Sequence, residues 1–289
     1  MKLVLILFAI TLCSAASASA AEFNNIIFSE SGKLCTVAST TGSGVRCLRE
    51  DFEFDSPAWQ PGGRTLVVEA GVHDGPHKLL LLSSSGETIR SLSESSGFIR
   101  PRWSSDGSSI YALSYDLGQA VGRWNAEGKN FSSVPVHSSE PFRYVQMLAF
   151  SPNGERAALL VDDFKKMLIA QVTNSGFEVE RVLPKQFSYV SQAAWLDDTR
   201  LLFVGKKDNP RAELWELNTK TGAVKMRGIN GLWIRDFLAL SPDRTTAVVC
   251  GSAVGAKQTR WSLWSYSLQN SLLVQLTNGI EDVTPAWRQ

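Results

Sequence analysis

Apolar and β-branched residues recur along the chain in short runs, and Pro, Gly, Asn, Asp or Ser separate one run from the next. Residues 65–68 (TLVV) and 247–249 (AVV) are examples, and each follows a large apolar residue and a turn segment. Runs of this composition between turn residues are typical of β-strands. The pattern predicts an all-β chain in which a strand, a tight turn and a second strand recur.

A large apolar anchor marks each repeat, at intervals of 44 to 47 residues. The anchors are Trp59, Trp103, Phe150, Trp195, Leu240 and Trp287. The residues that precede them are Ala58, Arg102, Ala149, Ala194, Ala239 and Ala286. Neighbouring strand residues face opposite sides, so large and small side chains should pack together between repeats. Because the anchors recur in every repeat, we interpret them as structural rather than as rings that stack on a ligand.

The phase of the repeat decides how residues 162–172 (DDFKKMLIAQV) are interpreted. Taken alone, this segment is compatible with a short helix, but in phase with the other repeats it is a strand, a loop and a strand. Third and fourth strands follow in each repeat, as in residues 78–86 (KLLLLSSSG) and 87–93 (ETIRSLS). Four antiparallel strands in about 45 residues are the unit of a β-propeller blade.

The two ends of the chain complement each other. Residues 33–48 resemble residues 78–92, so the chain begins with the outer strands of a blade, and residues 24–29 supply its second strand. Residues 281–289 (EDVTPAWRQ) supply only an inner strand. We predict that the termini share one composite blade, which leaves no open edge. With five complete repeats this makes a six-bladed β-propeller of four-stranded antiparallel blades, a single domain over residues 21–289.

Two cysteines face each other across the hairpin of the composite blade. Cys35 and Cys47 lie on its two strands, and a disulfide there would stabilise the fold by about 3 kcal/mol in an oxidising compartment. The alternative is a pair of small buried thiols. Cys250, in the run AVVCGS, is interpreted as a core residue.

The first 20 residues have the pattern of a cleavable secretory signal, with Lys2, an apolar run from Leu3 to Leu12, and a small-residue end at Ala20. Cleavage after Ala20 would place the protein in the periplasm or outside the cell. The bulky Leu12 before Cys13 disfavours a lipid anchor. No run is long enough to span a bilayer core of about 30 Å, so membrane insertion is not expected.

Charge excludes further classes of partner. The chain has 29 Lys and Arg against 28 Asp and Glu, and removal of the signal takes away Lys2 and no acid. A neutral surface argues against nucleic acid or an anionic membrane as the main partner.

The repeats resemble a known group. Segments such as SPAWQPGG, PRWSSDGSSIYAL, FSPNGERAALL and QLTNGIEDVTPAW are similar to the WD40-like, or PD40, repeats of TolB-like propellers and of propeller domains in prolyl-oligopeptidase-type peptidases. The resemblance covers essentially the whole chain after the signal. It implies an isolated propeller, because TolB's preceding α/β domain is absent and no Gly-x-Ser-x-Gly elbow occurs. It carries over no catalytic residue.

Strand direction assigns different roles to the two ends of such a ring. The inner-to-second and third-to-fourth turns lie at the bottom, and the longer second-to-third and blade-to-blade loops lie at the top, which we call the top face. Binding residues are expected on variable loops over a rigid scaffold. The candidates form what we call the top-face patch: Lys206, Lys207, Arg211, Trp233, Arg235, Lys257, Arg260 and Trp261. Trp and Arg are typical of interface hot spots; the alternative is solvated lysines and rings packed into loop bases.

The approaches to the inner strands line the mouth of the central channel. Polar candidates there are Asp55, Arg100, Gln146, Gln192, Asp236, Asp282 and Thr284. Such a ring is suited to a carboxylate, a sugar or a cation, or it is simply hydrated. A metal site on His73 and His77 is not expected, since His137 falls in another blade. Asn130 begins a glycosylation sequon that matters only in a eukaryotic host.

Two functions of different classes are compatible with these residues. The leading hypothesis is a monomeric binding module, without catalytic residues, metal or cofactor, that docks a protein or peptide through the top-face patch. The alternative is a hydrolase or lyase acting on a lactone or saccharide, with an axial divalent cation held by Asp55, Asp236 and Asp282.

Overall fold

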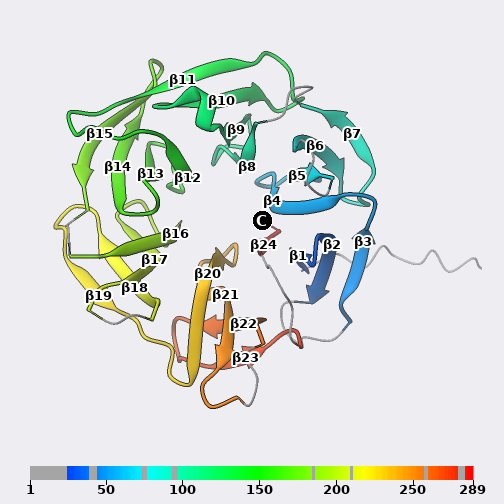
Figure 1. Cartoon of the computed structure of the whole chain (residues 1–289), viewed down its shortest axis with the longest axis vertical. Coiled ribbons are helices and arrows are strands. Elements are labelled where there is room, and N and C mark those ends of the chain that lie inside the picture. The colour runs from blue at the N-terminus through cyan, green and yellow to red at the C-terminus, as the bar shows by residue number, and fades with distance from the viewer. Residues whose placement is uncertain are drawn as a thin grey trace, which may run out of the picture.

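The chain folds into β-sheets arranged around a central axis, with β4, β8, β12, β16, β20 and β24 nearest the centre (Figure 1). The structure is a computed structural model that describes residues 25–38, 44–72, 77–92, 97–183, 186–208, 211–256, 260–278 and 284–288. Unit 1 consists of β4 (Glu53–Trp59), β5 (Thr65–Gly71), β6 (Lys78–Ser83) and β7 (Thr88–Ser91). Unit 2 consists of β8 (Ile99–Trp103), β9 (Ser109–Leu113), β10 (Ala120–Asn125) and β11 (Ser132–His137), with the 3-10 helix η1 (Tyr115–Leu117) before β10.

The remaining strands follow the same order. Unit 3 consists of β12 (Val145–Phe150), β13 (Arg156–Val161), β14 (Lys166–Val172) and β15 (Phe177–Val182). Unit 4 consists of β16 (Tyr189–Trp195), β17 (Arg200–Lys206), β18 (Glu213–Asn218) and β19 (Val224–Met226). Unit 5 consists of β20 (Leu232–Leu240), β21 (Thr246–Ala253), β22 (Ser262–Ser267) and β23 (Leu273–Gln275). The closing sheet consists of β24 (Ala286–Trp287), β1 (Asn25–Glu30), β2 (Lys33–Ala38) and β3 (Arg46–Arg49).

This arrangement confirms the predicted all-β organisation in four-stranded antiparallel sheets. Residues 162–172 follow the phase of the repeat: β13 ends at Val161, a turn follows, and β14 begins at Lys166. The composite sheet is also confirmed, because β24 pairs with β1 through the contacts Ile26–Trp287 and Ile27–Ala286.

Units 2 and 3 differ from the prediction of separate blades. Their outer strands β11 and β15 pair in parallel, so that the two units form one eight-stranded sheet. Gly176, just before β15, makes this approach possible. It has a φ of +146°, and a Cβ at this position would lie 2.4 Å from the Pro135 carbonyl oxygen. The sequence repeat does not predict this pairing, because it depends on close contact between two edges rather than on the pattern within a strand.

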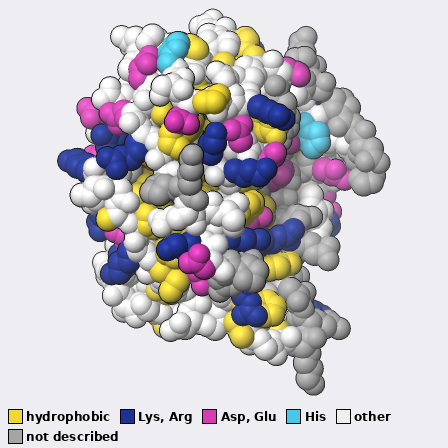
Figure 2. Space-filling model, turned by 60° about the vertical axis from the view of Figure 1, so that its left-hand side comes forward, with side chains coloured by type: hydrophobic (Ala, Val, Ile, Leu, Met, Phe, Trp, Pro, Cys, Tyr) yellow, Lys and Arg dark blue, Asp and Glu magenta, His cyan; other side chains and the backbone are white. Residues whose placement is uncertain are grey.

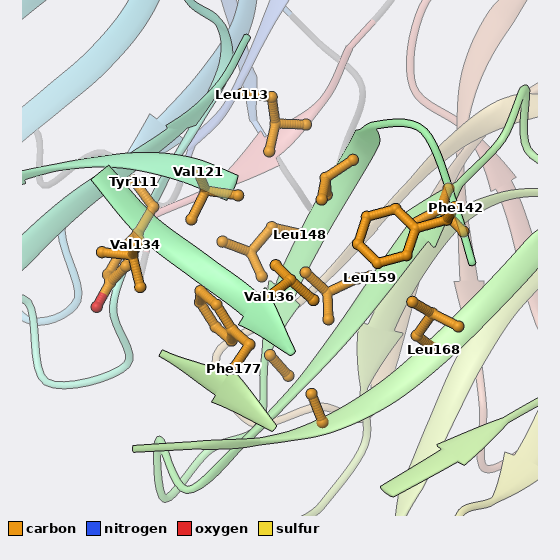
Figure 3. Packing of buried hydrophobic residues seen from close by; sticks show 14 residues of the cluster. Tyr111, Leu113, Val121, Val134, Val136, Phe142, Leu148, Leu159, Leu168 and Phe177 are labelled. Carbon is orange, nitrogen blue, oxygen red and sulfur yellow. The ribbon is translucent and has the colours of Figure 1, made fainter. Parts of the chain in front are cut away.

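The hydrophobic core is divided into clusters that lie between consecutive units. Six such clusters are found among the described residues, and together they link units 1 to 5 and the closing sheet into a ring. In the cluster between units 2 and 3, Tyr111 and Val121 pack against Leu148 and Phe177 (Figure 3). Burial of apolar side chains between sheets, at about 25 cal/mol per Å², is the main source of stability in such a ring.

The aromatic anchors belong to these interfaces. The Trp103 indole Nε1 donates a hydrogen bond to the Ala58 carbonyl oxygen (3.1 Å), and Trp195 Nε1 donates to the Ala149 oxygen (2.9 Å). Both indoles are buried. These two anchors therefore each tie one inner strand to the preceding one, which agrees with a structural role.

The closing sheet also contains the cysteine pair. Cys35 in β2 lies opposite Cys47 in β3, and the two are joined by a disulfide. Cys250 is buried in the cluster between unit 5 and the closing sheet. The described residues include no helix with the length and apolarity that a membrane crossing requires.

Candidate functional site

The inner strands pair irregularly near the polar residues predicted for the channel mouth. The inner strand of each of units 1 to 5 shifts register against its second strand, for example between Asp55 and Ala58 in β4 and between Ile99 and Arg102 in β8. Ser56 and Arg100 have positive φ angles of 47° and 50°, which non-glycine residues rarely adopt. Bulges of this kind re-aim side chains next to functional sites.

Asp55 and Thr284 meet at the mouth of the channel. Thr284 Oγ1 donates to Asp55 Oδ1 (2.7 Å), and the Ser56 backbone N–H donates both to Asp55 Oδ1 (2.5 Å) and to Thr284 Oγ1 (3.0 Å). The predicted neighbour Asp282 lies outside the described residues. These bonds join unit 1 to the segment that leads into β24.

A buried carboxyl that sequence reasoning missed lies beside this pair. Glu69, in β5, accepts a hydrogen bond from the Arg100 backbone N–H (3.1 Å), and its Oε1 lies 2.9 Å from Nδ1 of His77. Burial, and next the negative charge of Asp55, raise the pKa of Glu69 above its ordinary value. The available signal was that Glu69 is the one charged residue in the apolar strand TLVVEAG.

Arg100 and Gln146 form a second contact across adjacent units. Arg100 Nη1 donates to the Gln146 carbonyl oxygen (2.7 Å), and the guanidinium lies 5.1 Å from the centre of the Phe164 ring. The side-chain oxygen of Gln146 accepts from the Phe164 backbone N–H (2.8 Å). Arg100 and Gln146 therefore both make contacts that help to hold the mouth of the channel together.

The other two predicted mouth residues, Gln192 and Asp236, are not part of the hydrogen bonds described above. Gln192 lies deeper, in the wall of the channel. Asp236 interacts with Tyr189, which sequence analysis did not single out. Burial raises the pKa of the Tyr189 hydroxyl, and the charge of Asp236 and a hydrogen bond to it raise it further.

The structure gathers much of the top-face patch into stacked pairs. The Lys206 ammonium lies 5.1 Å from the Tyr189 ring centre, the Arg211 guanidinium 4.6 Å from that of Trp233, and the Arg235 guanidinium 5.4 Å from that of Trp261. An isolated β-bridge between Ala212 and Ile234 holds the β17–β18 loop beside β20. Each pair is of the cation–π type, worth about 0.5–1 kcal/mol when exposed.

Three predicted patch residues are not part of these stacks. Lys207 lies 3.9 Å from Asp208, Arg260 is exposed, and Lys257 falls outside the described residues. Figure 2 shows Lys and Arg side chains mixed with Asp and Glu over the face that it draws, in keeping with the balanced charge of the chain. The patch is thus an ordered set of aromatic and cationic groups rather than a broad basic field.

The histidines and cysteines form no metal centre among the described residues. The only described group of three potential ligands with atoms close together is Glu30, Cys35 and Cys47, and the disulfide engages both sulfurs. His77 pairs with Glu69, His137 lies in β11 near Glu178, and His73 is outside the described residues.

Comparison with known proteins identifies a family. Residues 32–228 match the sequence model of the lipoprotein LpqB β-propeller domain. A comparison with curated proteins found no significant match.

Solved structures with the same fold include two TolB proteins. Crystalline TolB from Acinetobacter baumannii is 16% identical with a TM-score of 0.71, over 91% of this chain and 66% of that chain. A putative TolB from Agrobacterium tumefaciens is 12% identical with a TM-score of 0.63, over 92% of this chain and 98% of that one. Oligogalacturonate lyase in complex with manganese is 14% identical with a TM-score of 0.54, over 86% of this chain and 71% of that chain. At these identities the likeness concerns the fold alone.

Proposed function

Since the chain belongs to the family of lipoprotein LpqB β-propeller domains, we propose that it is an exported binding propeller of the cell envelope that docks a protein or peptide through its top-face patch. The TolB-like fold supports an envelope role. In this proposal units 1 to 5 and the closing sheet are six blades of one monomeric domain, and the parallel pair β11–β15 is a local link between two of them.

The observation that carries the proposal is the set of three cation–aromatic stacks at the edge of units 4 and 5. Trp, Tyr and Arg supply most of the binding energy in protein interfaces. Because Trp233 and Trp261 are half-buried and stacked, less side-chain entropy remains to be lost when a partner binds. A partner segment with apolar and acidic side chains matches this surface.

The experiment compares capture of envelope proteins by purified variants, quantified by mass spectrometry. Trp233→Ala and Arg211→Ala are expected to lower capture of a specific partner by about tenfold or more. Trp233→Phe keeps a ring for Arg211 and should retain much of the binding. Arg90→Ala, an exposed arginine in β7 far along the ring, is the matched control. If correctly folded Trp233→Ala captured the partner as well as the wild type, the stacks would serve only to pack the loops, and the proposal would be wrong.

Export is tested by the N-terminus of the protein isolated from its host. The proposal expects a mature chain that begins at Ala21, which intact-mass measurement and N-terminal sequencing detect. A chain that begins at lipid-modified Cys13 would instead contradict the cleavage prediction.

A second function, a channel-centred hydrolase or lyase with an axial cation, is favoured by one observation. Asp55 and Glu69 lie opposite each other on β4 and β5, and the charge of Asp55 helps to raise the pKa of Glu69. Two carboxyls are fewer oxygen ligands than Ca²⁺ usually takes. Metal analysis of the purified protein, with melting curves in Ca²⁺, Mn²⁺ and EDTA, decides the matter: no bound metal and no shift would remove this function.

A further inference from the structure

A cavity of about 210 Å³ lies at the bottom end of the central channel, opposite the top-face patch. We call it the lower chamber. Its walls include five of the small residues that precede the anchors: Ala58, Ala149, Ala194, Ala239 and Ala286. Pro61, Ser105 and Ser241, from the inner-to-second turns, also line it, so the chamber faces the bottom of the ring.

Arg102 takes the sixth position in this ring of alanines. The residue as a whole is half-buried, and its Nη1 donates to the Pro101 carbonyl oxygen (2.8 Å). A guanidinium has five N–H donors. Within the described part of the chain this is the single hydrogen bond of Arg102, and it forms no ion pair there. Burial, and next the charge of Arg100, lower the pKa of Arg102 to about 10, so it stays protonated at neutral pH.

A second guanidinium lines the same cavity. Arg244, from the β20–β21 turn, donates from Nη1 to the Trp195 carbonyl oxygen. Burial also lowers the pKa of Arg244. The chamber thus has two cationic groups in its lining.

The described lining of the lower chamber contains no Asp or Glu. Asp55 and Glu69 act on Arg102 through their charge, and Asp198 and Asp197 act on Arg244, but none of these carboxylates lines the chamber. An anion bound in the chamber would pair with the guanidiniums directly and so lower the cost of burying their charge. The other lining side chains are mostly aliphatic or aromatic, and they include Leu148, Leu238, the alanines and the anchors Trp59, Trp103, Phe150, Trp195 and Trp287. The chamber therefore combines two cationic groups with aliphatic and aromatic side chains and with a few polar groups such as Gln192.

The channel narrows at Arg102. Above the lower chamber lies a void of only about 10 Å³, and the two cavities share Arg102, Gln192, Leu238, Pro57 and Pro285 in their walls. A ligand that enters from the bottom would therefore meet Arg102 and Gln192 at the inner end of the chamber, with its remaining atoms against the alanines.

We propose that the lower chamber binds an organic carboxylate carried on a short apolar chain, with the carboxylate on Arg102 and the chain against the alanine wall. Guanidinium and carboxylate match in bidentate geometry, and a charge-assisted pair is stronger out of bulk water. Gln192 offers a further amide donor, and Arg244 attracts the anion from the bottom side. Two kinds of ligand carry such a carboxylate: a free short-chain acid and the C-terminus of a peptide.

The test titrates the full chain with hexanoate by calorimetry, with hexanamide as the uncharged probe. Saturable binding of hexanoate is expected, and hexanamide should bind at least about tenfold more weakly. Arg102→Ala installs the residue found at the other five positions, so the ring should remain folded, and hexanoate affinity should also fall about tenfold or more. Arg90→Ala on the surface is the control for overall charge.

Two further arms separate the sources of the carboxylate. Acetylated Ala-Ala-Leu with a free C-terminus and the same peptide with an amidated C-terminus are compared with hexanoate. If the peptide with the free C-terminus binds more tightly than hexanoate, the natural ligand is the C-terminus of a peptide. If hexanoate binds more tightly, the natural ligand is a free acid. The proposal is overturned when neither carboxylate binds, when hexanamide binds as well as hexanoate, or when Arg102→Ala binds hexanoate unchanged. Trp233→Ala should keep hexanoate affinity, which separates this site from the top-face patch.

Discussion

Thr284 Oγ1 donates a 2.7 Å hydrogen bond to the carboxylate of Asp55, which lies 229 positions earlier in the chain. Both residues lie at the mouth of the channel, where unit 1 meets the segment before β24. The ring is therefore held at its seam by a polar contact as well as by strand pairing.

Thr284→Val should lower the free energy of unfolding by about 1–2 kcal/mol, because it removes the hydrogen bond to Asp55 and the one from the Ser56 N–H and keeps the side-chain shape. Urea denaturation measures this change. In a double-mutant cycle with Asp55→Asn, the two substitutions should be non-additive. Additive effects would show that the contact contributes nothing to the seam.

Deletion of residues 283–289 should give an unstable or oligomeric protein. The deletion removes β24 and leaves β1 with an unpaired inner edge, which favours association with another chain. Light scattering after size exclusion, together with a melting curve, measures the outcome. A truncated monomer with the melting temperature of the intact chain would contradict the shared closing sheet.

Replacement of both Cys35 and Cys47 by Ala should lower the free energy of unfolding by about 3 kcal/mol, since the unfolded chain is then no longer restricted by the disulfide that closes the loop between them. Reduction of the wild-type protein with dithiothreitol should likewise destabilise it and lower its melting temperature. The double variant is the control, because reductant should leave its melting curve unchanged.

Gly176→Ala should break the parallel pair of β11 and β15. The new Cβ would lie too close to the Pro135 oxygen, at a φ that suits glycine alone, and stability should fall by about 2 kcal/mol or more. Hydrogen exchange should speed up along the edge where β15 pairs with β11. Gly62→Ala is the control, because Gly62 also has a positive φ but open space around it; equal effects of the two variants would point to backbone strain alone.

Glu69→Gln should gain stability relative to the wild type as pH rises. Burial first, then Asp55, raise the pKa of Glu69, so the folded protein holds this proton more tightly than the unfolded chain does. The Glu69 contribution is therefore complete below the ordinary pKa of 4.5 and is lost as pH rises through the raised value. Melting curves between about pH 4 and pH 8 measure it. The exposed Glu87→Gln serves as control and should follow the wild type.

Some elements were predictable because their cause is local. The strand at Lys166–Val172 follows from the repeat phase, and the pairing of β1 with β24 follows from the incomplete blades at the two ends. Cys35 and Cys47 were placed opposite each other by the same phase. The repeat also marked Arg102 as the exception among the alanines, although its burial beside a cavity was not evident.

The site was less predictable, because it depends on distances across the ring. Sequence reasoning placed Asp55 and Thr284 together at the mouth but missed Glu69, which reaches it from a second strand. It grouped Arg211 with Trp233 on one face, whereas their stacking is a matter of tertiary packing.

By itself, the sequence determined the all-β repeat, the anchors and the seam, because strand periodicity and turn residues act over a few positions. Only the tertiary structure decided that β11 joins β15, which side chains stack on the top face, and that Arg102 and Arg244 line one chamber. Those relationships arise where different units approach one another, and the distances between units are set by packing rather than by any local pattern.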